Sequence, residues 1–242
     1  MKIRALIAAG AAAAVVAPAS AQTFDFESLV HGEIVSNQFA PDLTISGINI
    51  NRSFDIVAAF DTGLIGTADP DLEGPPWAGG NLAVDDDNVA LGKALIIAEI
   101  NTGAGDGVLD NPDDEGRRAA GSITFAFNRD IDLFGFDIID IEGVVVEGSS
   151  LDFFDDGVLV ASVDFNDFVD AGSIFFDASI VFGNNHANRF SPITAAQLGG
   201  SFDEVTLNLG GSGAIDNLVI PAPGAAALFA AGLLTAARRR RA

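Results

Sequence analysis

The chain has 242 residues, of which 49% are hydrophobic, so it can bury a real core as one large domain or two small ones. Its 34 acidic residues outnumber 12 basic ones, and the net charge of −22 disfavours nucleic acid and anionic membranes as partners and favours divalent cations. Cysteine is absent, which excludes disulfides, thiolate zinc sites, iron–sulfur clusters and cysteine nucleophiles.

The N-terminus has the pattern of a secretory signal peptide. Lys2 and Arg4 precede an apolar run over residues 5–17, and the small residues 19–21 follow it. We therefore expect residues 1–21 to be a signal peptide that signal peptidase removes between Ala21 and Gln22. The protein would then be secreted.

Residues 22–219 are predicted to form one all-β domain. Ile123, Phe125 and Phe127 alternate with polar or small residues, as do Val205, Leu207 and Leu209, and this period of two is typical of strands with one buried face. No long amphipathic helix interrupts the strands, which favours an antiparallel β-sandwich of the jelly-roll type. The other expected strands span 23–27, 43–50, 53–60, 94–100, 133–140, 150–155, 159–165, 173–181 and 214–220. The nearly continuous apolar runs 94–100 and 174–176 predict strands that are covered on both faces.

Three connections have turn or helix signals of their own. Asp156-Gly157 predicts a tight hairpin in which 151–155 pairs with 158–163, because both turn positions need residues that tolerate positive φ. Residues 210–213, Gly-Gly-Ser-Gly, are expected to join the last two strands in the same manner. A short helix is predicted from a Ser191 cap to Leu198, with Pro192 in its first turn and Gly199 at its end.

Two long acidic loops are the candidate metal site. The first spans residues 61–88 and the second 106–115, and loops of this length in a compact domain are usually functional. Carboxylates two to four residues apart can surround calcium, which takes six to eight oxygen ligands, although neither loop has EF-hand spacing. Solvated surface turns are the alternative interpretation. The proposed calcium ligands are Asp69, Asp71 and Glu73 in the first loop and Asp106, Asp110 and Asp113 in the second.

The single tryptophan, Trp77, is the candidate residue for binding a glycan. It lies among prolines and glycines, and its ring could stack on a sugar. The alternative is that Trp77 packs the loop onto the core.

Catalytic residues are not evident. The two histidines, His31 and His186, have no nucleophile motif near them, so serine hydrolysis is disfavoured. Paired carboxylates could still serve a glycoside hydrolase or lyase, because such enzymes need only two acids at the right separation. We therefore predict a non-enzymatic protein, with the hydrolase or lyase as the alternative.

The C-terminal segment 220–242 has three parts. Pro221-Ala222-Pro223-Gly224 precedes thirteen uncharged, mostly apolar residues, and Arg238, Arg239, Arg240 and Arg241 follow them. A helix over the apolar run would be roughly 20 Å long, short of the roughly 30 Å of a bilayer core. The arginines would stay on the cytoplasmic side. We expect a short hydrophobic helix that anchors the protein transiently in the inner membrane.

This arrangement resembles the PEP-CTERM sorting signal, with Pro-Ala-Pro in place of the usual Pro-Glu-Pro. The resemblance implies a bacterial exported protein whose tail is cut near residues 221–224 by an exosortase-like membrane protease, often in organisms that make extracellular polysaccharide. The Asp-Pro-Asp-Leu stretch 69–72 and the pair Pro76-Trp77 also resemble segments of other exported proteins with such tails. The resemblance leaves the function of the domain open.

Together these features predict a secreted or cell-surface β-sandwich from a Gram-negative-type bacterium. Once both ends are removed, residues 22–224 hold six basic and 34 acidic residues, a formal charge of −28. Calcium is the expected cofactor, since self-repulsion at this density favours bound cations. Extracellular polysaccharide is the expected partner, and a purely structural matrix role is a further alternative.

Overall fold

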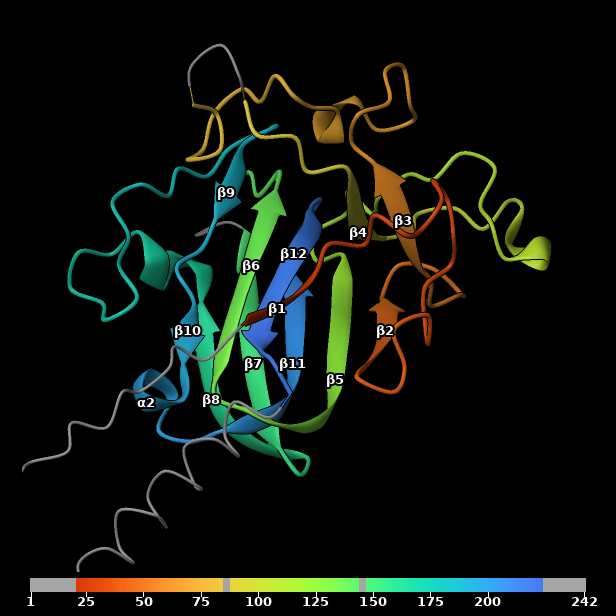
Figure 1. Cartoon of the computed structure of the whole chain (residues 1–242). Coiled ribbons are helices and arrows are strands. Elements are labelled where there is room, and N and C mark those ends of the chain that lie inside the picture. Colours follow the sequence, from red (N-terminus) through yellow and green to blue (C-terminus); the bar gives the residue numbers. More distant parts are fainter. Residues whose placement is uncertain (1–20, 85–87, 144–146, 224–242) are drawn as a thin grey trace, which may run out of the picture. The chain divides into compact units, whose positions relative to one another are not determined.

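The chain folds into two antiparallel β-sheets, shown in Figure 1. The computed structural model describes residues 21–84, 88–143 and 147–223. The larger sheet contains β1 (Ala21–Phe24), β3 (Val57–Asp61), β4 (Lys93–Ile97), β6 (Leu133–Ile139), β9 (Ala187–Arg189), β10 (Ile193–Thr194) and β12 (Ala214–Pro221). The smaller sheet contains β2 (Leu43–Asn49), β5 (Gly121–Ile131), β7 (Ser150–Asp155), β8 (Val158–Asp164) and β11 (Phe202–Leu209).

The strand order shows how the chain passes between the sheets. The larger sheet has the order β10-β6-β12-β4-β3, with β1 also paired to β12 and β9 to β6, and the smaller has β2-β5-β11-β7-β8. Helical turns are short. They are η1 (Pro70–Leu72), η2 (Ala104–Asp106), η3 (Phe165–Phe168) and α2 (Ala195–Leu198).

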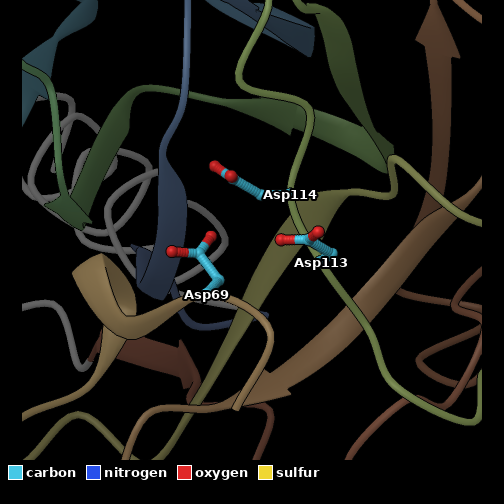
Figure 2. Close-up of side chains that lie close together, drawn as sticks. All are labelled: Asp69, Asp113 and Asp114. Atoms are coloured by element: carbon cyan, nitrogen blue, oxygen red, sulfur yellow. The ribbon is translucent and has the colours of Figure 1, made fainter. Parts of the chain in front are cut away.

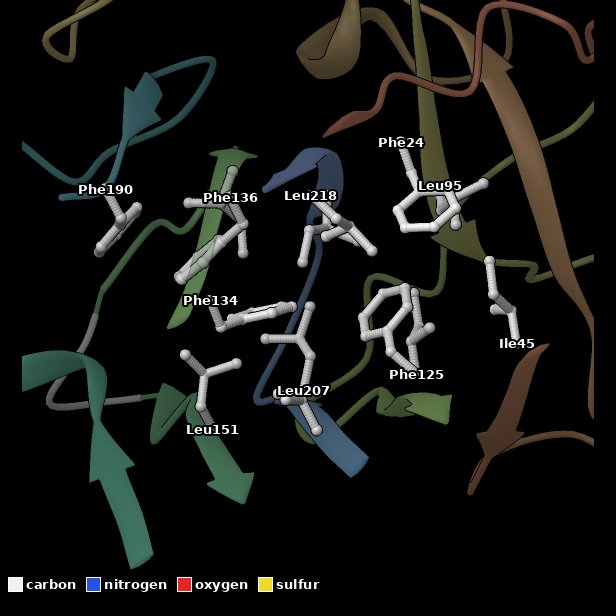
Figure 3. Close-up of a cluster of buried hydrophobic side chains, with 14 of the residues drawn as sticks. Phe24, Ile45, Leu95, Phe125, Phe134, Phe136, Leu151, Phe190, Leu207 and Leu218 are labelled. Carbon is white, nitrogen blue, oxygen red and sulfur yellow. The ribbon is translucent and has the colours of Figure 1, made fainter. Parts of the chain in front are cut away.

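The main core lies between the two sheets and makes the fold a β-sandwich. Figure 3 shows Phe125, Leu151 and Leu207 of the smaller sheet together with Phe134, Phe136 and Leu218 of the larger. The rings of Phe136 and Phe190 stack with centroids 4.5 Å apart. The predicted all-β sandwich is confirmed, including the alternation over residues 123–127 of β5 and 205–209 of β11, where every second residue is buried. Its jelly-roll form stays a prediction.

The larger sheet is also covered on its outer face. In β4, Leu95 and Ile97 belong to the main core, whereas Ala94 and Ile96 belong to a second buried cluster. That cluster includes Leu72, Trp77, Leu82, Leu91 and Leu109 from the segments between strands. We call the segments 62–84, 88–92 and 98–119 the outer layer. The prediction of a strand covered on both faces is therefore confirmed for β4.

The hairpin prediction is confirmed. β7 pairs with β8, with Leu151 opposite Val163 and Asp155 opposite Val158. Asp156 and Gly157 adopt φ values of 48° and 75°, which a tight hairpin turn requires.

The expected strand 173–181, with its run 174–176, is wrong. These residues form turns, and Ile174 and Phe176 are 69% and 43% exposed. Asp170 accepts a hydrogen bond from the amide of Gly172, and Asp177 accepts one from the amide of Ser179. Such local side-chain bonds compete with strand pairing. The expected hairpin at 210–213 is also wrong, because the segment joins β11 of one sheet to β12 of the other.

The short helix exists with a different beginning. Thr194, rather than Ser191, caps α2, and its side chain and that of Gln197 form a capping box. Pro192 therefore precedes the helix. Gly199 ends it with a φ of 91°, as predicted. The short strands β9 and β10 were not predicted, and β3 begins at Val57 rather than at residue 53.

Most of the predicted sorting signals lie outside the described residues. Of the expected signal peptide only Ala21 is described, and it begins β1 together with Gln22. Pro221 ends β12, and Ala222 and Pro223 follow it. Gly224, the apolar run and Arg238 to Arg241 lie outside. Among the residues that the structure describes, no helix is both long and apolar enough to cross a membrane.

Candidate metal centre

Three aspartates of the outer layer bring their carboxylates together. Asp69 directly precedes η1, and Asp113 and Asp114 lie in the segment that follows β4. One carboxylate oxygen from each lies within 4.8 Å of the others. Figure 2 shows how the three side chains gather. Three oxygen ligands at this spacing could hold a metal ion.

Asp69 is the least satisfied member of the group. Its side chain is 6% exposed, and Oδ1 accepts a hydrogen bond of 3.2 Å from the amide of Asp71, which caps η1. Its other oxygen, Oδ2, is buried without a hydrogen bond of normal length among the described residues, although the carboxyl group of Asp114 lies close to that of Asp69 and lowers its pKa in part. Burial raises the pKa of Asp69, because an ionised carboxylate loses its hydration there. A buried oxygen without a donor is a good position for a cation.

Asp114 is held by hydrogen bonds from the segment 210–213. Its Oδ2 accepts hydrogen bonds from the hydroxyl of Ser212 at 2.8 Å and from the amide of Gly213 at 2.6 Å. Its backbone forms an isolated bridge with Ala98, directly after β4. Burial, followed by the charge of Asp69, raises the pKa of Asp114 well above its usual value.

Asp113 lies next to a group of paired charges. Burial raises its pKa to about 6, and the charges of Asp69, Glu99 and Glu115 add to the effect. Arg52 lowers the pKa of Asp113 in part, although its guanidinium forms ion pairs with Glu99 and Glu115. Within the described residues, the ion pairs of the structure include no base bound to Asp69, Asp113 or Asp114.

A hydrogen-bond network ties this group to the end of β6. Asp140 follows β6, and its Oδ1 accepts a bond of 2.6 Å from the amide of Asn185. Its Oδ2 lies 2.8 Å from Oγ of Ser212, the same hydroxyl that contacts Asp114. The side-chain amide of Asn185 donates to the carbonyls of Asp71 and Glu73 on the other side of the group, at 2.9 Å each. Burial raises the pKa of Asp140 to about 7, and Asp71 and Asp69 contribute.

The structure places two of the six predicted ligands, Asp69 and Asp113, in the three-carboxylate group. Glu73 instead accepts hydrogen bonds from the amide and hydroxyl of Thr67, and these bonds lower its pKa. Asp71 is a close electrostatic neighbour of Asp69 and Asp140. Asp106 accepts a bond from the amide of Val108, and Asp110 is exposed. Glu73, Asp71, Asp106 and Asp110 are therefore outside the group.

Sequence reasoning missed Asp114, Ser212 and Asp140. Asp114 stands in the same acidic run as Asp113, so spacing alone could have included it. Ser212 and Asp140 come from segments far away in the chain, and neither has a local metal-binding pattern.

Trp77 does not present its ring to solvent. It is 5% exposed and belongs to the second buried cluster. Its Nε1 donates a hydrogen bond of 2.8 Å to the carbonyl of Val89. A Cβ placed on Gly74 would clash with the indole, so the ring packs tightly against that backbone. This packing fits the alternative interpretation, in which Trp77 holds the loop to the core, and leaves no ring face for a sugar.

Both histidines are used in local structure. Nδ1 of His31 accepts a bond of 3.0 Å from the amide of Asp61, and burial lowers the pKa of His31. Nδ1 of His186 lies 3.0 Å from the carbonyl of Val181. Neither contact pairs a histidine with a nucleophile.

A further buried acid, Asp216, lies in β12. Its Oδ1 is buried without a hydrogen-bond partner among the described residues, while Oδ2 accepts a bond of 2.7 Å from Asn217. Burial raises the pKa of Asp216 to about 9, and the charges of Asp137, Glu27 and Asp25 contribute. Burial therefore favours the neutral form of Asp216. Its neighbour Asp137 is neutralised by Arg189 at 2.7 Å.

Comparison with known proteins does not assign a family. No known family matches the chain, and no curated protein matches its sequence. Among solved structures, the chain is similar to the K2 cleaved adhesin domain of Lys-gingipain, with a TM-score of 0.39 and 10% identity over 84% of this chain and 100% of that one. A likeness this distant identifies no function for this chain.

Proposed function

We propose that this protein is an exported, non-enzymatic β-sandwich that binds calcium through Asp69, Asp113 and Asp114. The observation that carries the proposal is a group of three carboxylates within 4.8 Å of one another, which includes the buried side chain of Asp69 and in which Asp69 and Asp114 are close enough to share a proton when no cation is bound. Three acids held this close repel each other unless protons or a cation neutralise them. A bound cation would keep all three ionised.

The chemistry of the donors favours calcium over other metals. The group consists of carboxylate oxygens only, and hard oxygen ligands suit calcium, whereas zinc and copper prefer imidazole or thiolate. Backbone carbonyls and water would supply the remaining ligands that calcium requires. The strongly acidic composition adds a general attraction for cations.

Isothermal titration calorimetry of the metal-free protein with calcium chloride tests the proposal. We expect one saturable site, at least tenfold weaker in the variants Asp69→Asn and Asp113→Asn. Asp110→Asn is the matched control, because Asp110 is an exposed acid of the same loop that lies outside the group. Absence of saturable binding at millimolar calcium, or equal loss in the Asp110 variant, would contradict the site.

The sorting signals support export as part of the same proposal. Signal peptidase would cut after Ala21, and an exosortase-like protease would cut near residues 221–224 after transient anchoring in the inner membrane. The support comes from the basic, apolar and small-residue order at one end and the Pro-Ala-Pro, apolar and arginine order at the other. Mass spectrometry of both termini of the protein from its host tests this. An intact N-terminal methionine on the exported protein would refute the first cut.

We further propose a location at the cell surface or in the extracellular matrix, with a jelly-roll arrangement of the sandwich. Support for the jelly roll is the repeated passage of consecutive strands between the sheets, as from β4 to β5, β5 to β6 and β6 to β7. Extracellular polysaccharide remains a proposed partner without an assigned residue, since Trp77 is buried. A glycan array probed with the protein, with and without calcium, would test that partner directly.

A further inference from the structure

The hydroxyl of Ser212 contacts two carboxyl groups but has only one proton to donate. Its Oγ lies 2.8 Å from Oδ2 of Asp114 and 2.8 Å from Oδ2 of Asp140. A serine hydroxyl has one proton to donate, and an ionised carboxylate has none. If both aspartates were ionised, one of the two short contacts would bring two lone pairs together. Both contacts become full hydrogen bonds when one of the two carboxyl groups carries a proton.

The other hydrogen bonds identify which carboxyl carries it. Oδ2 of Asp114 already accepts the amide proton of Gly213 at 2.6 Å, so this oxygen acts as an acceptor. In Asp140 the backbone donor, the amide of Asn185, bonds to the opposite oxygen, Oδ1. Oδ2 of Asp140 is thus the oxygen that is free to hold a proton and to donate it to Ser212.

We propose that Asp140 and Ser212 are positioning residues of the cation site, in which a neutral Asp140 donates to Ser212 and Ser212 donates to an ionised Asp114. The relay fixes Oδ2 of Asp114 with two donors and leaves Oδ1 for the cation. This inference rests on the proposed function. A neutral Asp140 also explains how a fourth buried acid can lie next to the cation site without adding a negative charge to the site.

The surroundings of Asp140 agree with a neutral side chain. It is 1% exposed, and none of the ion pairs among the described residues includes it. Burial, followed by the charges of Asp71 and Asp69, raises the pKa of Asp140 to about 7, and Asp114, which contacts the same Ser212 hydroxyl, is a further acid. An amide at this position could make the same two bonds, accepting from Asn185 and donating to Ser212.

Paired variants test the relay by calorimetric titration with calcium chloride. Asp140→Asn preserves both bonds, so we expect its affinity to stay within about threefold of wild type, whereas Asp140→Ala should lose at least tenfold. Ser212→Thr should likewise bind, and Ser212→Ala should lose at least tenfold. In a double-mutant cycle the two alanine changes should be strongly non-additive, because either one breaks the same relay. Equal losses in Asp140→Asn and Asp140→Ala would overturn the proposal, since they would show that Asp140 acts as an anion.

An infrared measurement tests the proton itself without calcium. In the metal-free protein at about pH 6, the difference spectrum of wild type minus Asp140→Asn should contain the carbonyl band of a protonated carboxyl. A carboxylate band in its place would overturn the relay.

If wild type binds no calcium, the proposed function fails, and this spectrum still decides the protonation state of Asp140. If Asp140→Ala does not fold, the asparagine and Ser212 variants suffice, because loss of binding in Asp140→Asn alone contradicts the proposal.

Discussion

The main core between the sheets, called the inner core below, and the outer layer cover opposite faces of the larger sheet, but they are built from different residues. The inner core joins both sheets through phenylalanines and aliphatic side chains and includes fully buried rings such as Phe134, Phe136 and Phe153. The outer layer is made of long connections, and among its few large apolar side chains it buries acids such as Asp69 and Asp114. Apolar burial alone stabilises the first region, whereas the second also needs its negative charges neutralised.

This difference indicates a division of roles in one domain. The inner core determines the sandwich, and the outer layer contains the candidate metal centre. Because the layer's buried acids are stabilised by protons or a cation, its stability should depend on solution conditions that leave the inner core unchanged.

The largest expected effect is the loss of an inner ring. Phe136→Ala should lower the free energy of unfolding by about 3–5 kcal/mol, because it removes a fully buried aromatic side chain and leaves a cavity. The loss should be equal with calcium and with chelator in denaturant titrations. Phe176→Ala, at an exposed position, is the control and should change stability by less than about 0.5 kcal/mol. A loss that depends on calcium would mean that the two regions are not separable.

Removal of calcium should have the next largest effect and should be confined to the outer layer. At a calcium concentration one hundred times Kd, chelation should lower stability by about 2.7 kcal/mol. Hydrogen exchange followed by mass spectrometry should show faster exchange in 62–84 and 98–119, where amides such as those of Gly74 and Leu109 are hydrogen bonded, and little change in β11. A uniform increase over both sheets would contradict the division of roles.

The pH dependence in chelator should come next. Asp140 has its pKa raised to about 7 in the folded state, above the ordinary value of 3.8 in the unfolded chain, so the folded state binds more protons between these values. Stability should therefore rise as pH falls from 8 to 6, and Asp140 should contribute about 1.4 kcal/mol of that rise. Thermal unfolding of Asp140→Asn should lack this contribution. An identical pH profile for the variant would show that Asp140 titrates as it does in water.

The smallest effect is expected at Asp110. Asp110→Asn removes an exposed charge outside the metal group, so stability with or without calcium should change by less than about 0.5 kcal/mol. Differential scanning calorimetry in both conditions would show this. A calcium-dependent loss would extend the site along the loop.

Local patterns in the sequence predicted those parts of the fold that depend on neighbouring residues. The Asp156-Gly157 hairpin follows from two residues that tolerate positive φ between two alternating runs, and no distant contact is needed to specify it. Residues 173–181 show the limit. Their apolar content favours a strand, but a strand also needs a partner, and local bonds from Asp170 and Asp177 hold turns instead.

The candidate metal centre was predictable only in part, for the same reason. Acidic spacing identified the two loops and two of the three carboxylates, Asp69 and Asp113. It could not select among the acids of each loop, because burial decides that choice. Glu73 and Asp106 have the right chemistry, but each uses one carboxylate oxygen in local hydrogen bonds and lies outside the three-carboxylate group. Ser212 reaches the site from 98 positions after Asp114, a separation at which residue spacing contains no information.

The burial of Trp77 also gives the outer layer an intrinsic fluorescent probe. The sequence has one tryptophan and no tyrosine, so the indole of Trp77 is the source of any fluorescence that is excited selectively in tryptophan. Since that ring packs in the outer layer and not between the sheets, its emission would report the opening of one face while the phenylalanine core stays spectroscopically silent. Tryptophan fluorescence can thus distinguish opening of the outer layer from unfolding of the inner core without an added label.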